Sequence, residues 1–357
     1  MTHNCHERMS PPERMHALLS GKKPDRVPFI PFIFGYTAVT TGYKVGDIYA
    51  EPEISFRAQM LTQEMFGYDG SPLYGYASYG GWELGGELHF PYGKYEQAPH
   101  VTRHPLNTPE AVEMYQVPDD VSRCGAVPLM LRFSDMQAEY GMPVIVHAGT
   151  PFTFAGTTIG EELMLKWMKK EPRLVHMTLR KSTDFLLKVI DLFIERYGAE
   201  RMMAFDGGPT EANQLISPGQ FEEFALPYVS EIHDKAIVKG IRTFFSHICG
   251  EQNLNLPHWQ KVNYGSPGIV SFGHEVSLEK AVRMFGDKNI IAGNINTTII
   301  QMGTPEEVYE ETKRCILEGK DSPRGFVLMA GCEVPVQAPP INMHYMMKAL
   351  RDYGFYD

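Results

Sequence analysis

Short apolar segments alternate with longer amphipathic ones in the second half of the chain, and this alternation restricts the fold more than any other feature. Each apolar segment has the length of a buried strand, and helical spacing lies between several of them. The segments are 143–148, 202–206, 242–247, 268–272, 289–293 and 325–330. Helices are expected over 173–197, over 217–240 and after the capping box Thr304-Pro305-Glu306-Glu307. The pattern predicts a mostly parallel sheet covered by helices.

Two further segments bring the expected strands to eight. Residues 27–34 are apolar but contain two prolines, and residues 66–74 give a weaker strand signal. Eight strands favour a closed (β/α)8 TIM barrel, and residues 1–357 fit a single α/β domain. We expect residues 1–10 to be loose and an N-terminal helical extension to begin at Ser10-Pro11-Pro12-Glu13. An open doubly wound sheet is the alternative, although no GxGxxG or P-loop motif follows any expected strand.

Residues 68–95 interrupt the pattern with a glycine- and aromatic-rich insertion that has neither helical nor strand spacing. A long segment of this kind inside a compact domain is usually functional. Its aromatic rings can stack on a ligand, and the expected substrate-binding residues are Tyr74, Tyr76, Tyr79 and Trp82. A role of the same residues in packing or in an interface fits the sequence equally well.

Charge and cysteine content exclude several classes of function. A formal net charge of −10 opposes nonspecific binding to nucleic acid, which requires a basic surface. No apolar run is long enough to span a membrane, and the N-terminus lacks a signal core. We therefore expect no membrane insertion, no secretion and a cytoplasmic location. Five widely separated cysteines, an odd number, predict free or metal-bound thiols in a reducing compartment.

Polar residues follow several expected strands, at the end where barrel enzymes place their active sites. They are His147, Asp206, His247, His274, Asn294 and Cys332. We expect Asp206 and His147 to be catalytic and Asn294 to contact substrate. A turn aspartate and a packed histidine are the structural alternatives for the first two. His3, Cys5 and His6 also have metal-like spacing, which a loose terminus explains better.

His247-Ile248-Cys249 is the strongest local signal. Residues two apart in an extended chain point the same way, so the imidazole and the thiolate can bind one ion. Cys332 follows the strand at 325–330 and can supply a second thiolate. One nitrogen and two sulfurs suit tetrahedral Zn²⁺ with an open position for substrate. His274 or Glu275 would fill that position before substrate binds, although surface roles suit both. A buried histidine and two inert cysteines are the structural alternative.

The longer sequence around these residues resembles the uroporphyrinogen decarboxylase superfamily, and within it the corrinoid-dependent methyltransferases. The resemblance rests on the following segments: RTFFSHICG, NIIAGNINTTIIQMGTPEEV, GFVLMAGCEVPVQAPPINMHYMMKAL, PDRVPFIPF, HAGTPFTFAG and SPGQFEEFALPYVSEIHDKA. It implies a TIM barrel and a zinc site in which a His-x-Cys pair and a distant cysteine correspond to His247, Cys249 and Cys332. The decarboxylase itself has an arginine-rich element that here reads PFIFGYTAVTTGY, without arginine. A substrate with many carboxylates therefore lacks a cationic clamp.

The resemblance implies methyl transfer between a small substrate and cobalamin carried by a separate corrinoid protein, because no DxHxxG cobalamin motif is present. The tyrosines of 68–95 slightly favour a methoxylated aromatic donor and O-demethylation. Transfer from methylcobalamin to a thiol such as coenzyme M is the alternative. A metal-free decarboxylase-like lyase and a non-catalytic zinc or corrinoid-docking protein are two further hypotheses. A homodimer is expected only because relatives commonly form one.

Overall fold

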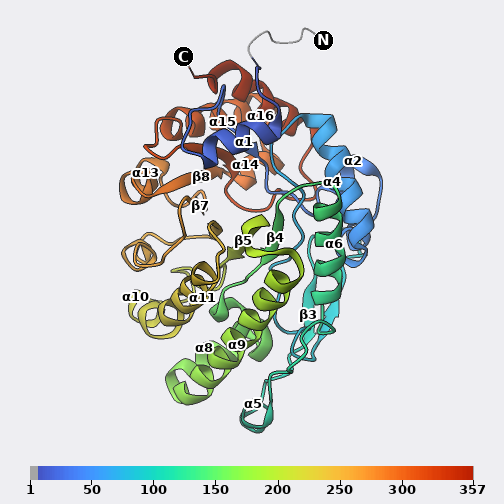
Figure 1. The fold of residues 1–357 in the computed structure, drawn as a ribbon, viewed down its shortest axis with the longest axis vertical. Helices are drawn as coiled ribbons and strands as arrows, with labels where there is room; N and C mark the ends of the chain where they lie inside the picture. The colour runs from blue at the N-terminus through green and yellow to red at the C-terminus, as the bar shows by residue number, and fades with distance from the viewer. Residues whose placement is uncertain (1–6, 357) are drawn as a thin grey trace.

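A curled parallel sheet lies at the centre of the chain, and helices wrap its outer face (Figure 1). The computed structural model describes residues 7–356. Within them the sheet has seven strands in the order β1-β9-β8-β7-β6-β5-β4, and every neighbouring pair is parallel. The strands are β1 (Phe29–Ile30), β4 (Val144–His147), β5 (Met202–Gly207), β6 (Phe244–Ile248), β7 (Gly268–Phe272), β8 (Asn289–Ile295) and β9 (Phe326–Ala330). This is the predicted TIM-barrel type of fold.

The helices begin where the sequence signals indicated. In α1 the Glu13 carboxylate accepts a hydrogen bond from the Ser10 backbone N–H at 2.8 Å, and in α15 Glu307 does the same for Thr304 at 2.7 Å. The α-helices are α1 (Pro11–Leu19), α2 (Thr37–Thr41), α3 (Val45–Ala50), α4 (Pro52–Phe66), α5 (Pro109–Met114), α6 (Val127–Glu139), α7 (Pro151–Ile159), α8 (Glu161–Lys170), α9 (Pro172–Tyr197), α10 (Pro218–Gln220), α11 (Leu226–Val238), α12 (Leu256–Trp259), α13 (Leu278–Phe285), α14 (Thr297–Met302), α15 (Pro305–Gly319) and α16 (Pro340–Tyr353). A 3-10 turn (Ala199–Arg201) precedes β5, and a π-helical turn (Phe221–Ala225) joins α10 to α11. No helix within residues 7–356 has both the length and the apolar character that crossing a bilayer requires.

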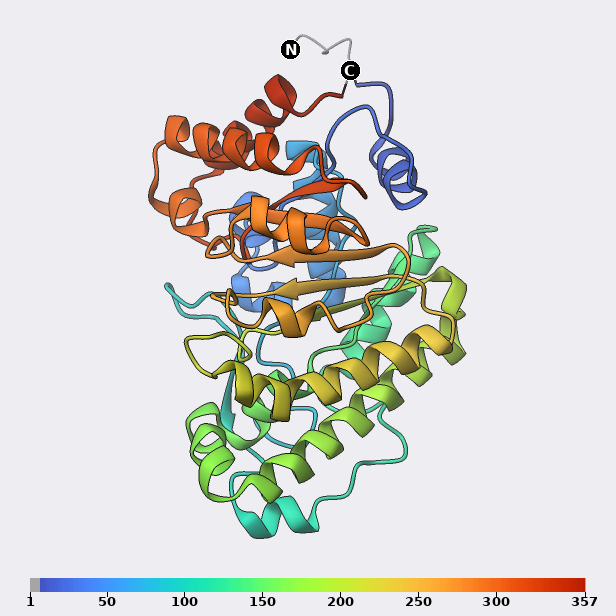
Figure 2. The same cartoon turned by 90° about the vertical axis from the view of Figure 1, so that its left-hand side faces the viewer.

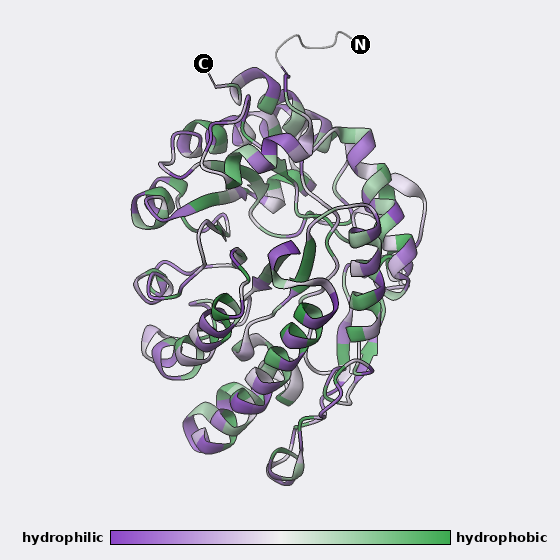
Figure 3. Cartoon of the chain, viewed as in Figure 1, coloured by the Kyte–Doolittle hydropathy of each residue, from purple (hydrophilic) through white to green (hydrophobic). Residues whose placement is uncertain are grey.

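Alternate residues of the strands point into the barrel and form an apolar interior. Buried members of this interior cluster are Phe205, Phe245, Ile269, Ile290, Ala292, Val327 and Met329. The opposite strand faces and the inner faces of the helices form a second, larger core. Figure 3 shows the same arrangement, with hydrophobic strands and helices that carry hydrophobic and hydrophilic faces. In Figure 2, β7 and β8 run side by side with their arrowheads in the same direction, so polar residues after each strand gather at one end.

The expected strand at 66–74 is absent, which corrects the sequence analysis. One backbone hydrogen bond, from Asp69 N to Phe29 O at 2.8 Å, connects this segment to β1. Side chains of α4 and α6 bond several of its other backbone groups. The Gln59 amide bonds both the N–H and the carbonyl of Leu73, each at 2.8 Å, and the Gln63 amide donates to the Gly70 carbonyl at 2.9 Å. Because side chains satisfy these groups, the segment fills the eighth place in the barrel without forming a ladder.

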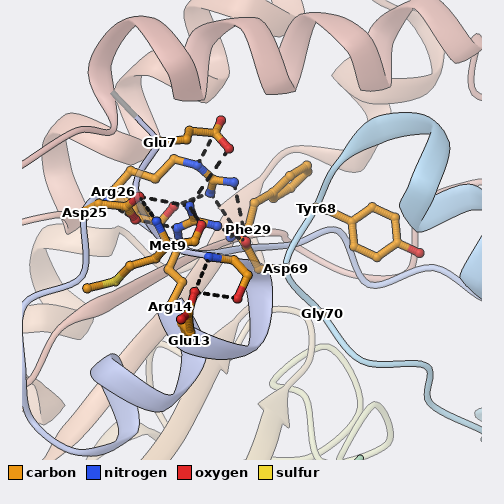
Figure 4. Close-up of polar contacts among 12 residues, drawn as sticks. Glu7, Met9, Glu13, Arg14, Asp25, Arg26, Phe29, Tyr68, Asp69 and Gly70 are labelled. Atoms are coloured by element: carbon orange, nitrogen blue, oxygen red, sulfur yellow. Dashed lines mark hydrogen bonds and ion pairs between the residues drawn. The ribbon is translucent and has the colours of Figure 1, made fainter. Parts of the chain in front are cut away.

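Buried charges close the barrel at the amino end of β1 (Figure 4). Asp69 accepts hydrogen bonds from the Phe29 backbone N–H at 2.8 Å, from Arg26 Nη1 at 2.7 Å and from Arg14. Arg14 also donates from Nε to Asp25 at 2.7 Å, and both arginines are fully buried. We call Arg14, Asp25, Arg26 and Asp69 the lower ion cluster. It joins α1, the start of β1 and the 66–74 segment, three parts of the chain that share no ladder.

The insertion at 68–95 is mostly irregular, as expected, but it ends in a short strand. β2 (Glu87–His89) pairs antiparallel with β3 (His100–Arg103) outside the barrel. Tyr74, Tyr76 and Tyr79 are buried rather than displayed on the surface. His3, Cys5 and His6 lie outside the described residues.

Candidate metal centre and active-site cavity

Position along the strands determines which polar residues enter the barrel mouth. Phe205 and Phe245 point inward, so His247, two residues after Phe245, points inward as well. The register pairs His247 with Ser271 of β7, and His247 Nδ1 lies 2.9 Å from Ser271 Oγ. The hydrogen bond orients the ring and leaves Nε2 for another ligand.

The structure brings the three predicted metal ligands together. The ligand atoms of His247, Cys249 and Cys332 all lie within 4.8 Å of one another, and the two sulfurs are 3.7 Å apart. His247 Nε2 is buried and has no hydrogen-bond partner. A buried polar atom without a partner costs free energy unless something binds it. A nitrogen and two sulfurs at these separations suit Zn²⁺, so the residues fit the metal that the sequence predicted.

The thiols of Cys249 and Cys332 have pKa values that shift in opposite directions. A hydrogen bond from Cys249 lowers the pKa of Cys332 well below the usual value of a thiol. The same hydrogen bond, together with burial, raises the pKa of Cys249 well above it. Cys332 is therefore the thiol of the pair that ionises more readily, and a divalent cation would favour ionisation of both. The described cysteines, Cys124, Cys249, Cys315 and Cys332, are all free thiols, as predicted.

A largely apolar cavity of about 670 Å³, including the space at its opening, lies over these ligands. We call it the mouth cavity. Besides the three ligands, three of the predicted residues line it, namely His147, Tyr76 and Tyr79. Its other walls are Phe32, Phe34, Ala77, Gly149, Thr150, Thr153, Phe154, Phe205, Gly207, Pro209 and Glu333. No lysine or arginine is among its lining residues.

His147 ends β4 and forms part of the floor of this cavity. Its ring stacks on Tyr79, with centroids 4.8 Å apart and planes at 23°. Burial lowers the pKa of His147 to about 4, so the imidazole is neutral at pH 7. Its Nδ1 is buried without a hydrogen-bond partner, and the Tyr79 hydroxyl is also buried without one.

Asp206, which was predicted to be catalytic, lies outside the cavity lining. It follows the inward-facing Phe205 and therefore points to the opposite face of the sheet. There it lies 2.6 Å from Nε2 of His233 on α11, and both side chains are buried. The ring of His233 stacks on Phe244. This pair joins β5 to the helical layer.

The other predicted site residues also lie outside the cavity lining. Asn294 donates to the carbonyls of Gly273 at 3.0 Å and Val276 at 2.6 Å, and thereby holds the loop after β7. Tyr74 donates its hydroxyl hydrogen to the Tyr49 carbonyl, and Trp82 packs edge-on against Phe90. His274 and Glu275 form an ion pair at 3.6 Å and are not in the three-ligand group.

Two buried carboxyl groups of the site were missed by sequence reasoning. Glu333 accepts hydrogen bonds from Tyr49 Oη at 2.9 Å and from Gly35 N at 3.1 Å, and burial raises its pKa to about 7. Glu211 accepts one from Thr153 at 2.6 Å, its Oε1 has no partner, and burial raises its pKa to about 7. The position of Glu333 directly after Cys332 was a usable signal. Nothing local distinguishes Glu211.

The chain is similar in sequence to methyltransferases and to uroporphyrinogen decarboxylases. Methylated-thiol–coenzyme M methyltransferase of Methanosarcina mazei is 28% identical over 71% of this chain, and the match spans 65% of that relative. Methylcobamide:CoM methyltransferase of Methanosarcina acetivorans is 27% identical over 74% of each chain. Uroporphyrinogen decarboxylase of Myxococcus xanthus is 22% identical over 72% of each.

A solved methyltransferase structure from Methanosarcina mazei superposes with a TM-score of 0.79, covering 97% of this chain and 99% of the other at 20% identity. This similarity confirms the fold. A sequence model of the family described as uroporphyrinogen decarboxylase (URO-D) matches residues 10–353, nearly the whole chain. The chain therefore belongs to the uroporphyrinogen decarboxylase (URO-D) family.

Proposed function

We propose that this chain is a corrinoid-dependent methyltransferase whose Zn²⁺ is held by His247, Cys249 and Cys332. The observation that carries the proposal is the partnerless Nε2 of His247, buried beside two sulfurs that are 3.7 Å apart. A lyase that needs no metal has no use for this donor set. The named activities of the Methanosarcina relatives support the same reaction class.

In this proposal each residue of the centre has a separate task. Ser271 fixes the imidazole of His247 so that Nε2 faces the sulfurs. When bound, Zn²⁺ would supply Lewis-acid activation of a thiol or of an ether oxygen. His274 and Glu275 stay predictions as fourth ligands, because the group of converging ligand atoms contains neither.

We propose a methoxylated aromatic compound as the methyl donor. Phe32, Phe34 and Phe205 together with Tyr79 provide apolar walls for a ring. The neutral His147 offers hydrogen bonding without adding charge. The cavity lining contains no cation that could pair with a sulfonate or a carboxylate. Removal of a methyl group from a neutral ether suits this environment.

Transfer of a methyl group to a thiol is the second candidate, because the relatives that act on coenzyme M favour it. An anionic thiol would meet Glu333 and no lining lysine or arginine, which is the argument against coenzyme M itself. Decarboxylation of a porphyrinogen is less favoured, since several carboxylates would require several cations. A non-catalytic docking barrel would explain neither the neutral His147 nor the aromatic walls.

The methyl group would pass to or from cobalamin on a separate corrinoid protein, as the named activity of the methylcobamide:CoM methyltransferases suggests. The opening of the mouth cavity is the proposed place for that partner to dock. A homodimer and a cytoplasmic location stay predictions of the sequence analysis.

Zinc content and demethylation measured on the same protein samples test the proposal. We expect about one zinc per chain and demethylation of methoxybenzenes by cob(I)alamin. Cys249→Ser should lose the zinc, and its demethylation rate should fall by at least about 100-fold. Cys124→Ser is the matched control, because Cys124 is also a free thiol but lies outside the site. Absence of zinc, or full activity in Cys249→Ser, would contradict the proposal. Activity with thiols alone would select the second candidate.

A further inference from the structure

A second cavity lies deeper in the barrel than the mouth cavity. It occupies about 880 Å³, including the space at its opening. Its walls are Met15, Leu19, Ile30, Pro31, Phe32, Ile33, Phe34, Gln59, Tyr68, Gly70, Ser71, Leu73, Pro143, Ile145, Met203, Phe245 and Ile269. We call it the lower chamber. It lies at the seam between β1 and β4, where the 66–74 segment replaces a strand.

The two largest polar side chains in the wall of the lower chamber, Gln59 and Tyr68, are already paired. The Gln59 amide is bonded to both backbone groups of Leu73, and the Tyr68 hydroxyl donates to the Gln59 carbonyl at 3.0 Å. No charged residue lines the chamber. Water would find few partners there, whereas an apolar molecule would lose little by entering. The chemistry of the wall therefore selects an uncharged apolar ligand.

Two residues, Phe32 and Phe34, line both cavities, and their rings pack edge-on with centroids 5.5 Å apart. We assign the partition to Phe32, because its ring centroid lies 5.0 Å from the ring of His247 and 5.8 Å from that of Phe205. Phe32 is also the one residue other than glycine with a positive φ, 60°, within residues 7–356. A side chain is strained in this left-handed conformation, and such strain occurs where surrounding structure imposes it, often at ligand sites.

We infer that the lower chamber is a second binding site, which takes a small uncharged aromatic or aliphatic molecule, and that the Phe32 ring separates it from the metal centre. This site does not depend on the proposed methyl transfer, because it is defined by its own walls. It also accounts for the strained backbone of Phe32, because the ring of this residue lines both cavities.

Crystals of the full chain exposed to xenon and to iodobenzene would locate the site directly. We expect anomalous density among Ile145, Met203 and Phe245, below the Phe32 ring. Density in the mouth cavity alone, or none in either cavity, would overturn the inference. In solution, Ile145→Trp should fill the chamber and reduce the rise in melting temperature that benzene causes in the wild type. An unchanged rise in a folded Ile145→Trp variant would likewise overturn it.

The partition is tested separately with Phe32→Gly, a change that the positive φ tolerates. Joining the two cavities should let biphenyl bind at least about tenfold more tightly than to the wild type by calorimetry, while benzene gains little. Phe245→Leu is the matched control, because it enlarges the chamber but leaves the Phe32 ring in place. An equal gain in Phe245→Leu, or no gain in Phe32→Gly, would contradict the role of Phe32.

Discussion

The two ends of this barrel treat buried polar groups in opposite ways. At the amino end of β1, the lower ion cluster places two fully buried arginines against Asp25 and Asp69, and Asp69 accepts hydrogen bonds from both arginines and from Phe29 N. Within this cluster only Arg26 Nε has no hydrogen-bond partner, and it pairs with the Glu7 carboxylate at 3.5 Å. At the mouth, buried atoms lack partners: Nδ1 of His147, Nε2 of His247, the Tyr79 hydroxyl and Oε1 of Glu211.

This difference distinguishes a structural use of polar residues from a functional one. Buried charges that satisfy one another hold elements together, whereas buried groups without partners lower stability and persist where a ligand will complete them. Removing a charge should therefore lower the free energy of unfolding at the amino end of β1 and raise it at the mouth.

Asp69→Asn should cause the largest loss of stability. Loss of the carboxylate leaves Arg14 and Arg26 buried without full compensation, which typically costs about 3–5 kcal/mol of the free energy of unfolding. Urea unfolding measures it. Glu87→Gln is the control, because its ion pair with Arg103 is exposed and should contribute at most about 1 kcal/mol. If Asp69→Asn lowers the free energy of unfolding by less than about 1 kcal/mol, the lower ion cluster does not stabilise the fold and the contrast between the two ends of the barrel fails.

The mouth was more predictable from sequence than the opposite end. His147, His247 and Cys332 follow apolar strands, and strand ends converge in a parallel barrel whatever the rest of the chain does. The same alternation places Asp206 on the opposite sheet face from Phe205, which is why its partner, His233, comes from the helical layer and the catalytic prediction is wrong.

The closure of the barrel could not be predicted in the same way. Residues 66–74 carry a weak strand pattern, yet Gln59 and Gln63 of α4 take their backbone hydrogen-bonding groups. The partners of Asp69 at positions 14 and 26 are likewise distant in sequence and carry no local motif. Such tertiary hydrogen bonds override a local propensity of modest strength.

Glu211→Gln should have the opposite effect to Asp69→Asn and stabilise the protein in a pH-dependent way. Burial raises the folded-state pKa of Glu211 to about 7, above its ordinary value of 4.5. The native state then holds a proton that the unfolded chain releases, so wild-type stability falls as pH rises from about 4.5 through 7. The gain in the variant should be negligible below pH 4.5 and should approach about 3 kcal/mol at pH 8.

Urea unfolding of both proteins between pH 5 and pH 8 checks this pH dependence. Glu83→Gln is the matched control at an equally buried carboxyl group whose oxygens accept from Tyr76, Gly80 and Ala126. A glutamine amide has one oxygen and one NH₂ group, so it would place a donor against at least one of those donors. Glu83→Gln should therefore lower the free energy of unfolding. A stability difference between Glu211→Gln and wild type that stays constant with pH would contradict the raised pKa.

A pair of hydroxyl deletions gives the smallest expected effect and the cleanest comparison of the two ends. The Tyr79 hydroxyl at the mouth is buried without a partner, whereas the Tyr68 hydroxyl beside the lower chamber donates to Gln59 O at 3.0 Å. Tyr79→Phe should therefore raise the free energy of unfolding by about 1 kcal/mol, and Tyr68→Phe should lower it by a similar amount. Both changes remove one oxygen atom from a buried ring, so volume and apolar area cancel between them. Urea midpoints that move in the same direction would show that a missing partner does not separate functional from structural polar groups in this barrel.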